Sequence, residues 1–285
     1  MKFSLNGTNV EVDSNPASRL SDVLREDLGA TGVKVGCNAG DCGACTVLID
    51  GEPVCSCMVP VTRANGCDIK TVEGLARNEA AERLQRAFLH YGAAQCGICT
   101  PGMLMAAVSL LKINAYPTEQ ETMDGLGGVL CRCTGYRKIV EAVMNAHDFS
   151  EPVIIAEKDH AVGARIGRLD GLEKVTGTEI YSDDYAPDDA LVVKVVRSPY
   201  HRARFEIGDV DTFVKNNPGV VQVFTIKDIP GENRFGVIPN FAEQPVFADE
   251  ITRFRGEAVA AIAGEAKCMA ILDLDNFPVL WTELP

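Results

Sequence analysis

Eight of the eleven cysteines fall into two sets of four, and their spacing limits what the chain can fold around. The first set begins with Cys37-x4-Cys42-x2-Cys45 in one glycine-rich loop. This spacing is typical of plant-type ferredoxins, which hold a 2Fe–2S cluster. The glycines of the loop let the backbone adopt positive φ and wrap closely around a cluster. Zinc sites favour paired C-x2–4-C knuckles rather than a triplet. The first set therefore predicts a 2Fe–2S site.

The fourth ligand of this first site is either Cys55 or Cys57. We place both on one strand, where residues two positions apart point to the same face. Spacing alone does not choose between them.

The second set pairs Cys96-x2-Cys99 with Cys131-x-Cys133, with 31 residues between the pairs. Taken alone, these pairs would also suit zinc. Beside a ferredoxin-like domain, a second 2Fe–2S cluster is the better interpretation. Each pair precedes a predicted helix, and the positive ends of two helix dipoles would stabilise a negatively charged cluster. Two neighbouring clusters indicate a relay for single electrons.

We predict an α+β multidomain protein, since 285 residues suit about two or three domains. Two hairpins, a helix and the cysteine loop make residues 1–73 a β-grasp, ferredoxin-like 2Fe–2S domain. Residues 74–148 carry four helical segments around the second site, and residues 149–171 form a connector. Residues 172–285 mix strands and helices in a third domain.

Local signals support this division. The Asn6-Gly7 and Asp50-Gly51 dipeptides predict tight hairpin turns. Thr100-Pro101 predicts the N-cap and first residue of a helix, and Thr118-x-x-Glu121 predicts a capping box. The elements predicted beyond the connector are strands at 191–196, 220–225 and 259–263 and a helix at 210–217.

Composition excludes several classes of function. A net charge of −13 disfavours nucleic acid, because phosphate contacts need clusters of Lys and Arg. The N-terminus has no apolar core of a signal peptide, and no stretch approaches the roughly 18 apolar residues of a membrane span. We therefore expect a cytoplasmic chain, with cysteines acting as metal ligands or thiols. No nucleophilic triad stands out, so we predict no catalytic residue here.

The sequence contains three long motifs: Val35-Gly36-Cys37 with Gly40-x-Cys42-Gly43-Ala44-Cys45, Gln95-Cys96-Gly97-x-Cys99-Thr100-Pro101-Gly102, and Cys131-Arg132-Cys133-Thr134-Gly135-Tyr136. These motifs resemble the iron–sulfur part of the xanthine oxidase family of molybdenum hydroxylases. Among its members, the bacterial aldehyde oxidoreductases that lack a flavin domain are the most similar. Residues 168–177, followed by Tyr181 and Asp183-Asp184, resemble the start of the family's molybdenum domain, and the stretch to Pro285 resembles its hammerhead-type subdomain.

The resemblance implies roles for individual residues. The family places the fourth ligand in a Ser-Cys dipeptide, which favours Cys57 after Ser56. It also implies that Gln95 and Cys133 approach a molybdopterin cofactor. The implied metal ligands are Cys37, Cys42, Cys45 and Cys57 for one 2Fe–2S cluster, and Cys96, Cys99, Cys131 and Cys133 for the other.

The function that the resemblance implies is that of an oxidoreductase subunit. A molybdopterin-binding large subunit would hydroxylate an aldehyde or an N-heterocycle such as a purine with oxygen from water. Electrons would pass through the two clusters to a separate FAD subunit or a soluble carrier. We expect no FAD on this chain, because the connector is too short for a flavin domain. The alternatives are a free-standing two-cluster electron carrier with a docking domain, and a zinc-stabilised interaction protein.

Overall fold

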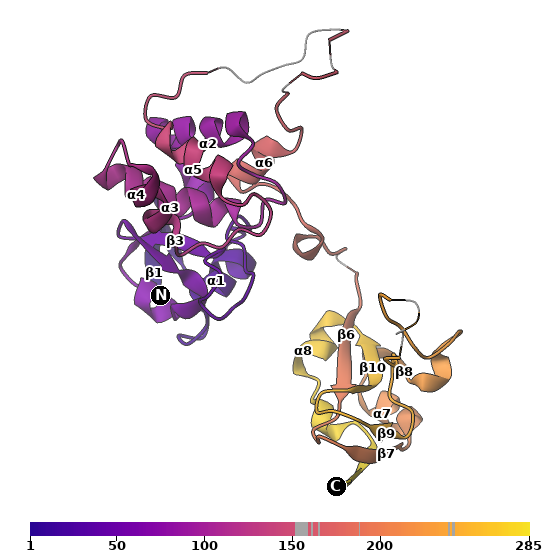
Figure 1. Cartoon of the computed structure of the whole chain (residues 1–285). Coiled ribbons are helices and arrows are strands. Elements are labelled where there is room, and N and C mark those ends of the chain that lie inside the picture. The colour runs from indigo at the N-terminus through magenta and orange to yellow at the C-terminus, as the bar shows by residue number, and fades with distance from the viewer. Residues whose placement is uncertain (152–158, 161, 165, 188, 239, 241–242) are drawn as a thin grey trace. The chain divides into compact units, whose positions relative to one another are not determined.

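The computed structural model describes residues 1–285 except 152–158, 161, 165, 188, 239 and 241–242. The chain forms two compact units, Met1–Asp184 and Tyr185–Pro285 (Figure 1). The predicted connector at 149–171 includes several of the positions outside the described residues. Among the described residues, no helix has the length and apolar character needed to cross a membrane.

The first unit opens with a five-stranded sheet in the order β2-β1-β5-β3-β4. Neighbouring strands are antiparallel except for the parallel pair β1 and β5. The predicted turns are confirmed, because Asn6, Gly7, Asp50 and Gly51 all have positive φ. The strands are β1 (Lys2–Leu5), β2 (Thr8–Glu11), β3 (Thr46–Ile49), β4 (Glu52–Cys55) and β5 (Asp68–Lys70).

One short helical segment covers this sheet. It consists of α1 (Leu20–Asp22) and a π-helical turn at Val23–Asp27. Its apolar side chains Leu20 and Leu24 are fully buried in the core of the sheet domain. The sequence spacing predicted one regular helix here, whereas the structure has a widened last turn.

Four helices follow the sheet and form the second part of the first unit. Asn78 caps α2 by accepting hydrogen bonds from the backbone N–H groups of Ala80 and Ala81. The capping box of α4 between Thr118 and Glu121 is confirmed. The helices are α2 (Glu79–Tyr91), α3 (Thr100–Ile113), α4 (Glu119–Leu126) and α5 (Arg137–Met144).

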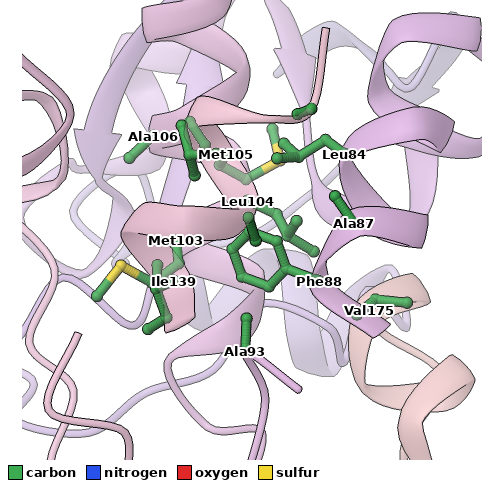
Figure 2. Packing of buried hydrophobic residues seen from close by; sticks show 14 of the residues in the cluster. Leu84, Ala87, Phe88, Ala93, Met103, Leu104, Met105, Ala106, Ile139 and Val175 are labelled. Carbon is green, nitrogen blue, oxygen red and sulfur yellow. The ribbon is translucent and has the colours of Figure 1, made fainter. Parts of the chain in front are cut away.

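Helix α3 is the centre of this layer. It contacts α4, strand β3 and the short helix α6 (Gly171–Thr176), while α2 packs on α5. A helix that is apolar on all sides is expected in such a position. Its residues Met103, Leu104 and Met105 are fully buried among side chains from the neighbouring helices, including Phe88 of α2 (Figure 2).

The first unit extends through Asp184. The sequence analysis placed residues 172–184 in the third domain, but α6 packs on α2 and α3. The buried Val175 belongs to the same apolar core as those helices.

The two halves of the first unit meet where three glycines, Gly43, Gly102 and Gly128, bring backbone against backbone. A Cβ atom on Gly102 would lie 2.5 Å from the carbonyl oxygen of Gly43, and one on Gly43 would lie 2.0 Å from that of Gly128. Gly43 also has a φ of +66°, which favours glycine. We call this contact the glycine seam. No larger residue fits at Gly43 or Gly102 without separating the two halves.

The second unit contains two three-stranded antiparallel sheets, β6-β10-β8 and β11-β7-β9. They enclose a core in which Phe213 meets Phe277 edge to face at 5.2 Å between ring centroids. The elements are β6 (Val192–Arg197), β7 (Ala203–Ile207), α7 (Val210–Asn216), β8 (Val220–Phe224), β9 (Ile251–Thr252), β10 (Ala258–Gly264), α8 (Ala266–Ile271) and β11 (Val279–Glu283).

The predicted elements of this unit are confirmed, and they correspond to β6, α7, β8 and β10. Strands β7, β9 and β11 and helix α8 were not predicted from the sequence. Strand β7 alternates apolar with charged residues over only five positions, and β9 has two residues. Such short segments carry little periodic signal.

Replacing Leu104 by Ala should destabilise the first unit strongly. Leu104 is fully buried, and a buried Leu→Ala change leaves a cavity that lowers the free energy of unfolding by about 2–5 kcal/mol. The measurement is the denaturant midpoint of the chain. Ile113→Ala on the same helix is the control, because Ile113 is 84% exposed and its loss should change the midpoint little.

Replacing Gly102 by Ala tests the glycine seam. Helix propensity alone would make this change stabilising by roughly 1 kcal/mol. The clash with the Gly43 carbonyl should instead destabilise the chain by about 1–3 kcal/mol, as overpacking usually does. Gly128→Ala is the matched control, because a Cβ atom there meets nothing within 4 Å. A Gly102→Ala chain at least as stable as the unmodified one would contradict the seam.

Candidate metal centres

Three cysteines of the first thiol set, Cys37, Cys42 and Cys45, lie in the loop between the π-helical turn and β3. The loop folds back on itself at Asn38, Gly40 and Gly43, which all have positive φ. The Sγ atom of Cys37 accepts hydrogen bonds from the backbone N–H groups of Ala39 and Cys42, both at 3.3 Å. These hydrogen bonds lower the pKa of Cys37 to about 7. The loop thus favours a thiolate at Cys37.

Cys45 and Cys57 form the buried side of this set. The backbone N–H of Cys57 points at the Sγ atom of Cys45, 3.5 Å away, and Ser56 donates from its hydroxyl to the Cys45 carbonyl at 2.7 Å. Burial, together with the neighbouring Cys45, raises the pKa of Cys57 to about 11. Cys37 also lies within electrostatic reach of Cys57. The structure therefore brings together the four cysteines implied for the first site.

Cys55 lies beside the same loop. Its Sγ atom is 3.8 Å from the carbonyl oxygen of Gly40. Burial raises the pKa of Cys55, and the charge on Cys57 raises it further. The prediction that Cys55 and Cys57 share a strand is wrong, because β4 ends at Cys55 and Cys57 lies in a 3₁₀ turn at Ser56–Met58.

The second thiol set lies at the beginnings of α3 and α5. Cys99 is the residue that caps α3, although the sequence predicted Thr100 in that position. The Sγ atoms of Cys96 and Cys133 are 3.4 Å apart. Cys99 is buried, and burial and the neighbouring Cys131 raise its pKa strongly. The two pairs therefore meet, with Cys99 inside and Cys96 and Cys133 exposed at the surface.

Polar groups around Cys131 favour its ionised form. Burial opposes ionisation, but the hydroxyl of Thr134 lies 3.2 Å from the Cys131 Sγ atom, and hydrogen bonds from Thr134 lower the pKa of Cys131 below its ordinary value. The backbone N–H of Cys131 donates to the hydroxyl of Tyr136 at 2.8 Å. Tyr136 itself holds a positive φ of 67° immediately before α5. This contact of Tyr136 was not predicted from the sequence.

The two sets are joined through the backbone. The N–H of Leu130 donates to the carbonyl oxygen of Cys42 at 2.9 Å, and the residue after Leu130 is Cys131. This hydrogen bond therefore holds Cys42 of the first set close to Cys131 of the second. The glycine seam lies at the same place, since Gly43 follows Cys42 and Gly102 begins the helix that Cys99 caps.

Gln95 is exposed and precedes Cys96 in the chain. It lines a cleft of about 380 Å³ whose walls include Lys138 and Arg168. Because Cys133 lies next to Cys96, the two residues implied as cofactor contacts are on the same exposed side of the second set. Neither is part of the buried core.

The donor chemistry of both sets fits an iron–sulfur cluster. Each set offers four sulfur atoms and, in the described residues, no competing carboxylate or imidazole is hydrogen-bonded to any of them. Backbone N–H groups point at sulfur in the first set, and a hydroxyl does so in the second. In the part of the chain that the structure describes, no group of three or more His, Cys, Asp or Glu side chains is placed so that it could hold a single metal ion.

Three family models match the chain in succession. Residues 3–71 match a 2Fe–2S iron–sulfur cluster binding domain, and residues 71–144 match a [2Fe–2S] binding domain. Residues 176–285 match the a/b hammerhead domain of aldehyde oxidase and xanthine dehydrogenase. The predicted ferredoxin-like, helical and hammerhead-like folds are thereby confirmed.

Known proteins resemble the chain over its whole length or over half of it. An aldehyde oxidoreductase of Megalodesulfovibrio gigas is 34% identical over 309 residues, covering 99% of this chain and 33% of that protein. The small FeS subunit of nicotinate dehydrogenase from Eubacterium barkeri is 47% identical over 146 residues, covering 51% of this chain and 93% of that subunit.

A solved structure of the aldehyde oxidoreductase from Desulfovibrio gigas superimposes with a TM-score of 0.79 at 32% identity, covering all of this chain and 34% of that one. The chain thus spans about a third of the length of the aldehyde oxidoreductases it matches. The match to those proteins includes both cluster-binding domains and the hammerhead domain of this chain. The chain belongs to the xanthine oxidase family of molybdenum hydroxylases.

Proposed function

We propose that this chain carries electrons from a molybdenum site to an acceptor through two 2Fe–2S clusters, one in residues 1–73 and one in residues 74–148. The observation that carries the proposal is the junction of the two thiol sets. The Leu130–Cys42 hydrogen bond and the glycine seam hold the sets against each other. Electron transfer requires neighbouring centres, and this packing supplies them.

The ligand assignment is part of this proposal. A 2Fe–2S cluster supplies a one-electron carrier when four thiolates hold it. Cys57 is preferred over Cys55 because its N–H points at Cys45 and its side chain is fully buried beside that residue. The proposed ligands are Cys37, Cys42, Cys45 and Cys57 at the first site and Cys96, Cys99, Cys131 and Cys133 at the second.

The second site is proposed to face the molybdenum cofactor. Cys96 and Cys133 are exposed, whereas Cys45 and Cys57 of the first set are buried. Gln95 and Cys133 would hold a molybdopterin by hydrogen bonds on this exposed side. Electrons would then enter at the second set and leave by way of the first.

The partners follow from the same reasoning. A molybdopterin-binding large subunit would hydroxylate an aldehyde or an N-heterocycle with oxygen from water. A separate FAD subunit or a soluble carrier would accept the electrons. This chain matches 93% of the length of the small FeS subunit of nicotinate dehydrogenase, which supports a role within a multi-subunit enzyme.

Iron content and electron paramagnetic resonance test the proposed function. The purified chain should contain roughly four iron atoms and four inorganic sulfides, and reduction should produce two distinct paramagnetic signals. Half that iron and one signal would remove the second site. Zinc in place of iron would exclude electron transfer altogether. When the partner is present, its substrate should reduce both centres, and failure to do so would favour a free-standing carrier.

A pair of cysteine variants tests the choice of the fourth ligand. Cys57→Ser should abolish or strongly alter the signal of the first cluster, because serine replaces a ligand thiolate. Cys55→Ser is the matched control, since it removes a thiol beside the same loop and should leave iron content and both signals unchanged. If only Cys55→Ser damaged the first cluster, the assignment would be reversed.

A further inference from the structure

A single segment, residues 168–184, which overlaps the end of the predicted connector, contacts both halves of the first unit. It begins before α6 and ends at Asp184, where the second unit starts. We call this segment the strap. The sequence analysis assigned most of it to the third domain and gave its side chains no role.

The end of the strap is anchored to the sheet domain by buried charges. The Asp184 carboxylate accepts hydrogen bonds from Arg25 and from the ammonium group of Lys34, which is 3.0 Å away. The Asp184 and Lys34 side chains are both only 5% exposed. Arg25 also donates to the carbonyls of Thr31 and Val33, at 2.9 and 2.8 Å. The anchor therefore fixes the segment that leads into the first cysteine loop.

The middle of the strap is anchored to the helical half. Gln85 of α2 donates to the carbonyl of Val175 at 2.7 Å, and both groups are buried. The hydroxyl of Tyr181 donates to the carbonyl of Cys96 at 2.6 Å. A Cβ atom on Gly97 would lie 2.3 Å from that hydroxyl oxygen. Only glycine at position 97, with its φ of +89°, lets Tyr181 approach the cysteine backbone.

Two lysines hold the Tyr181 ring in place. The Lys34 ammonium lies 4.7 Å and the Lys174 ammonium 5.9 Å from the ring centroid. Lys174 is itself buried, and its charge is paired with Asp170 at 2.7 Å and Glu179 at 2.8 Å. Its stem packs on Gly97.

Such a network contributes more to fixing the positions of the groups it holds than to the free energy of unfolding. Removing charges from water offsets most of what buried ion pairs gain, so packing apolar residues in the same space would stabilise the fold equally well. Paired charges and hydrogen bonds, however, define one geometry for the groups they hold. In this network, one of the groups held in a defined position is the Tyr181 hydroxyl, which donates to the carbonyl oxygen of Cys96.

We propose that the strap locks the two cluster domains together and that Tyr181 is a positioning residue that sets the reduction potential of the cluster at the second site. The inference rests on the proposed function, since it requires a cluster there. The potential of a cluster depends on the charge around it and on hydrogen bonds to its sulfurs, and polar groups that hold its ligands contribute as well. The Tyr181 O–H points its positive end toward the Cys96 backbone, which favours the reduced, more negative cluster.

The decisive experiment compares Tyr181→Phe with Tyr185→Phe in the full chain. Tyr185 lies four residues further on and is 70% exposed, so it controls for the loss of a tyrosine hydroxyl. Both variants and the unmodified chain are titrated with a reductant while the two paramagnetic signals are recorded. At the midpoint of the unmodified second cluster, Tyr181→Phe should lower its reduced-to-oxidised ratio about threefold, the effect of one modest hydrogen bond.

The first cluster should titrate unchanged in Tyr181→Phe, and neither cluster should shift in Tyr185→Phe. A Tyr181→Phe chain with a lower melting temperature but an unchanged second midpoint would reduce the strap to a packing element and overturn the inference. If the unmodified chain holds iron for only one cluster, the proposed function itself fails, and this is established before any variant is compared.

A second variant tests the anchor while leaving Tyr181 and the thiols intact. Asp184→Asn should loosen the strap, so that backbone amides in 168–184 exchange faster with deuterium and the second midpoint falls as in Tyr181→Phe. Asp189→Asn, an exposed position in the second unit, is the control. Faster exchange in Asp184→Asn without a change of midpoint would contradict the proposed link between strap and potential.

Discussion

The close approach of two backbones at the glycine seam is the constraint on which the arrangement of the first unit depends. Gly43 belongs to the first cysteine loop and Gly102 to the first turn of α3. The seam therefore brings together the backbone segments that carry the two thiol sets. Side chains could not bring the loops this close, because a single Cβ atom at either position would overlap a carbonyl oxygen. The hydrogen bond from Leu130 to Cys42 fits within the same narrow space.

In this unit, the interactions that stabilise the fold differ from those that fix the position of residues 168–184. Apolar burial around α3, with Phe88 and Leu104 fully enclosed, supplies the main stabilising contribution. The charged groups at Asp184 and Lys174 add little net free energy but define where residues 168–184 lie. Charged groups therefore hold the strap in place on a unit that is stabilised by apolar burial. Within the strap, the Tyr181 hydroxyl donates to the carbonyl oxygen of Cys96.

Much of the arrangement could be predicted because the cysteines of the first loop, and those of each pair in the second set, are close in sequence. Cys37, Cys42 and Cys45 share a loop, and the structure brings the two distant pairs of the second set together as predicted. Contacts between segments far apart in the chain could not be predicted in this way. Asp184 meets Arg25 across 159 positions, and no local pattern marks the pair. Cys57 was placed on a strand because alternation was assumed to continue, whereas the chain turns at Ser56.

The glycine seam also determines which changes in the sequence can alter the junction between the two centres. Both sides of the contact are main chain, so the spacing is fixed by peptide geometry and not by the size or charge of any side chain. Substitutions at exposed positions of the sheet and of the helices should therefore leave the position of one thiol set relative to the other unchanged. A side chain added at Gly43 or Gly102, by contrast, would act directly on the distance between the two sets.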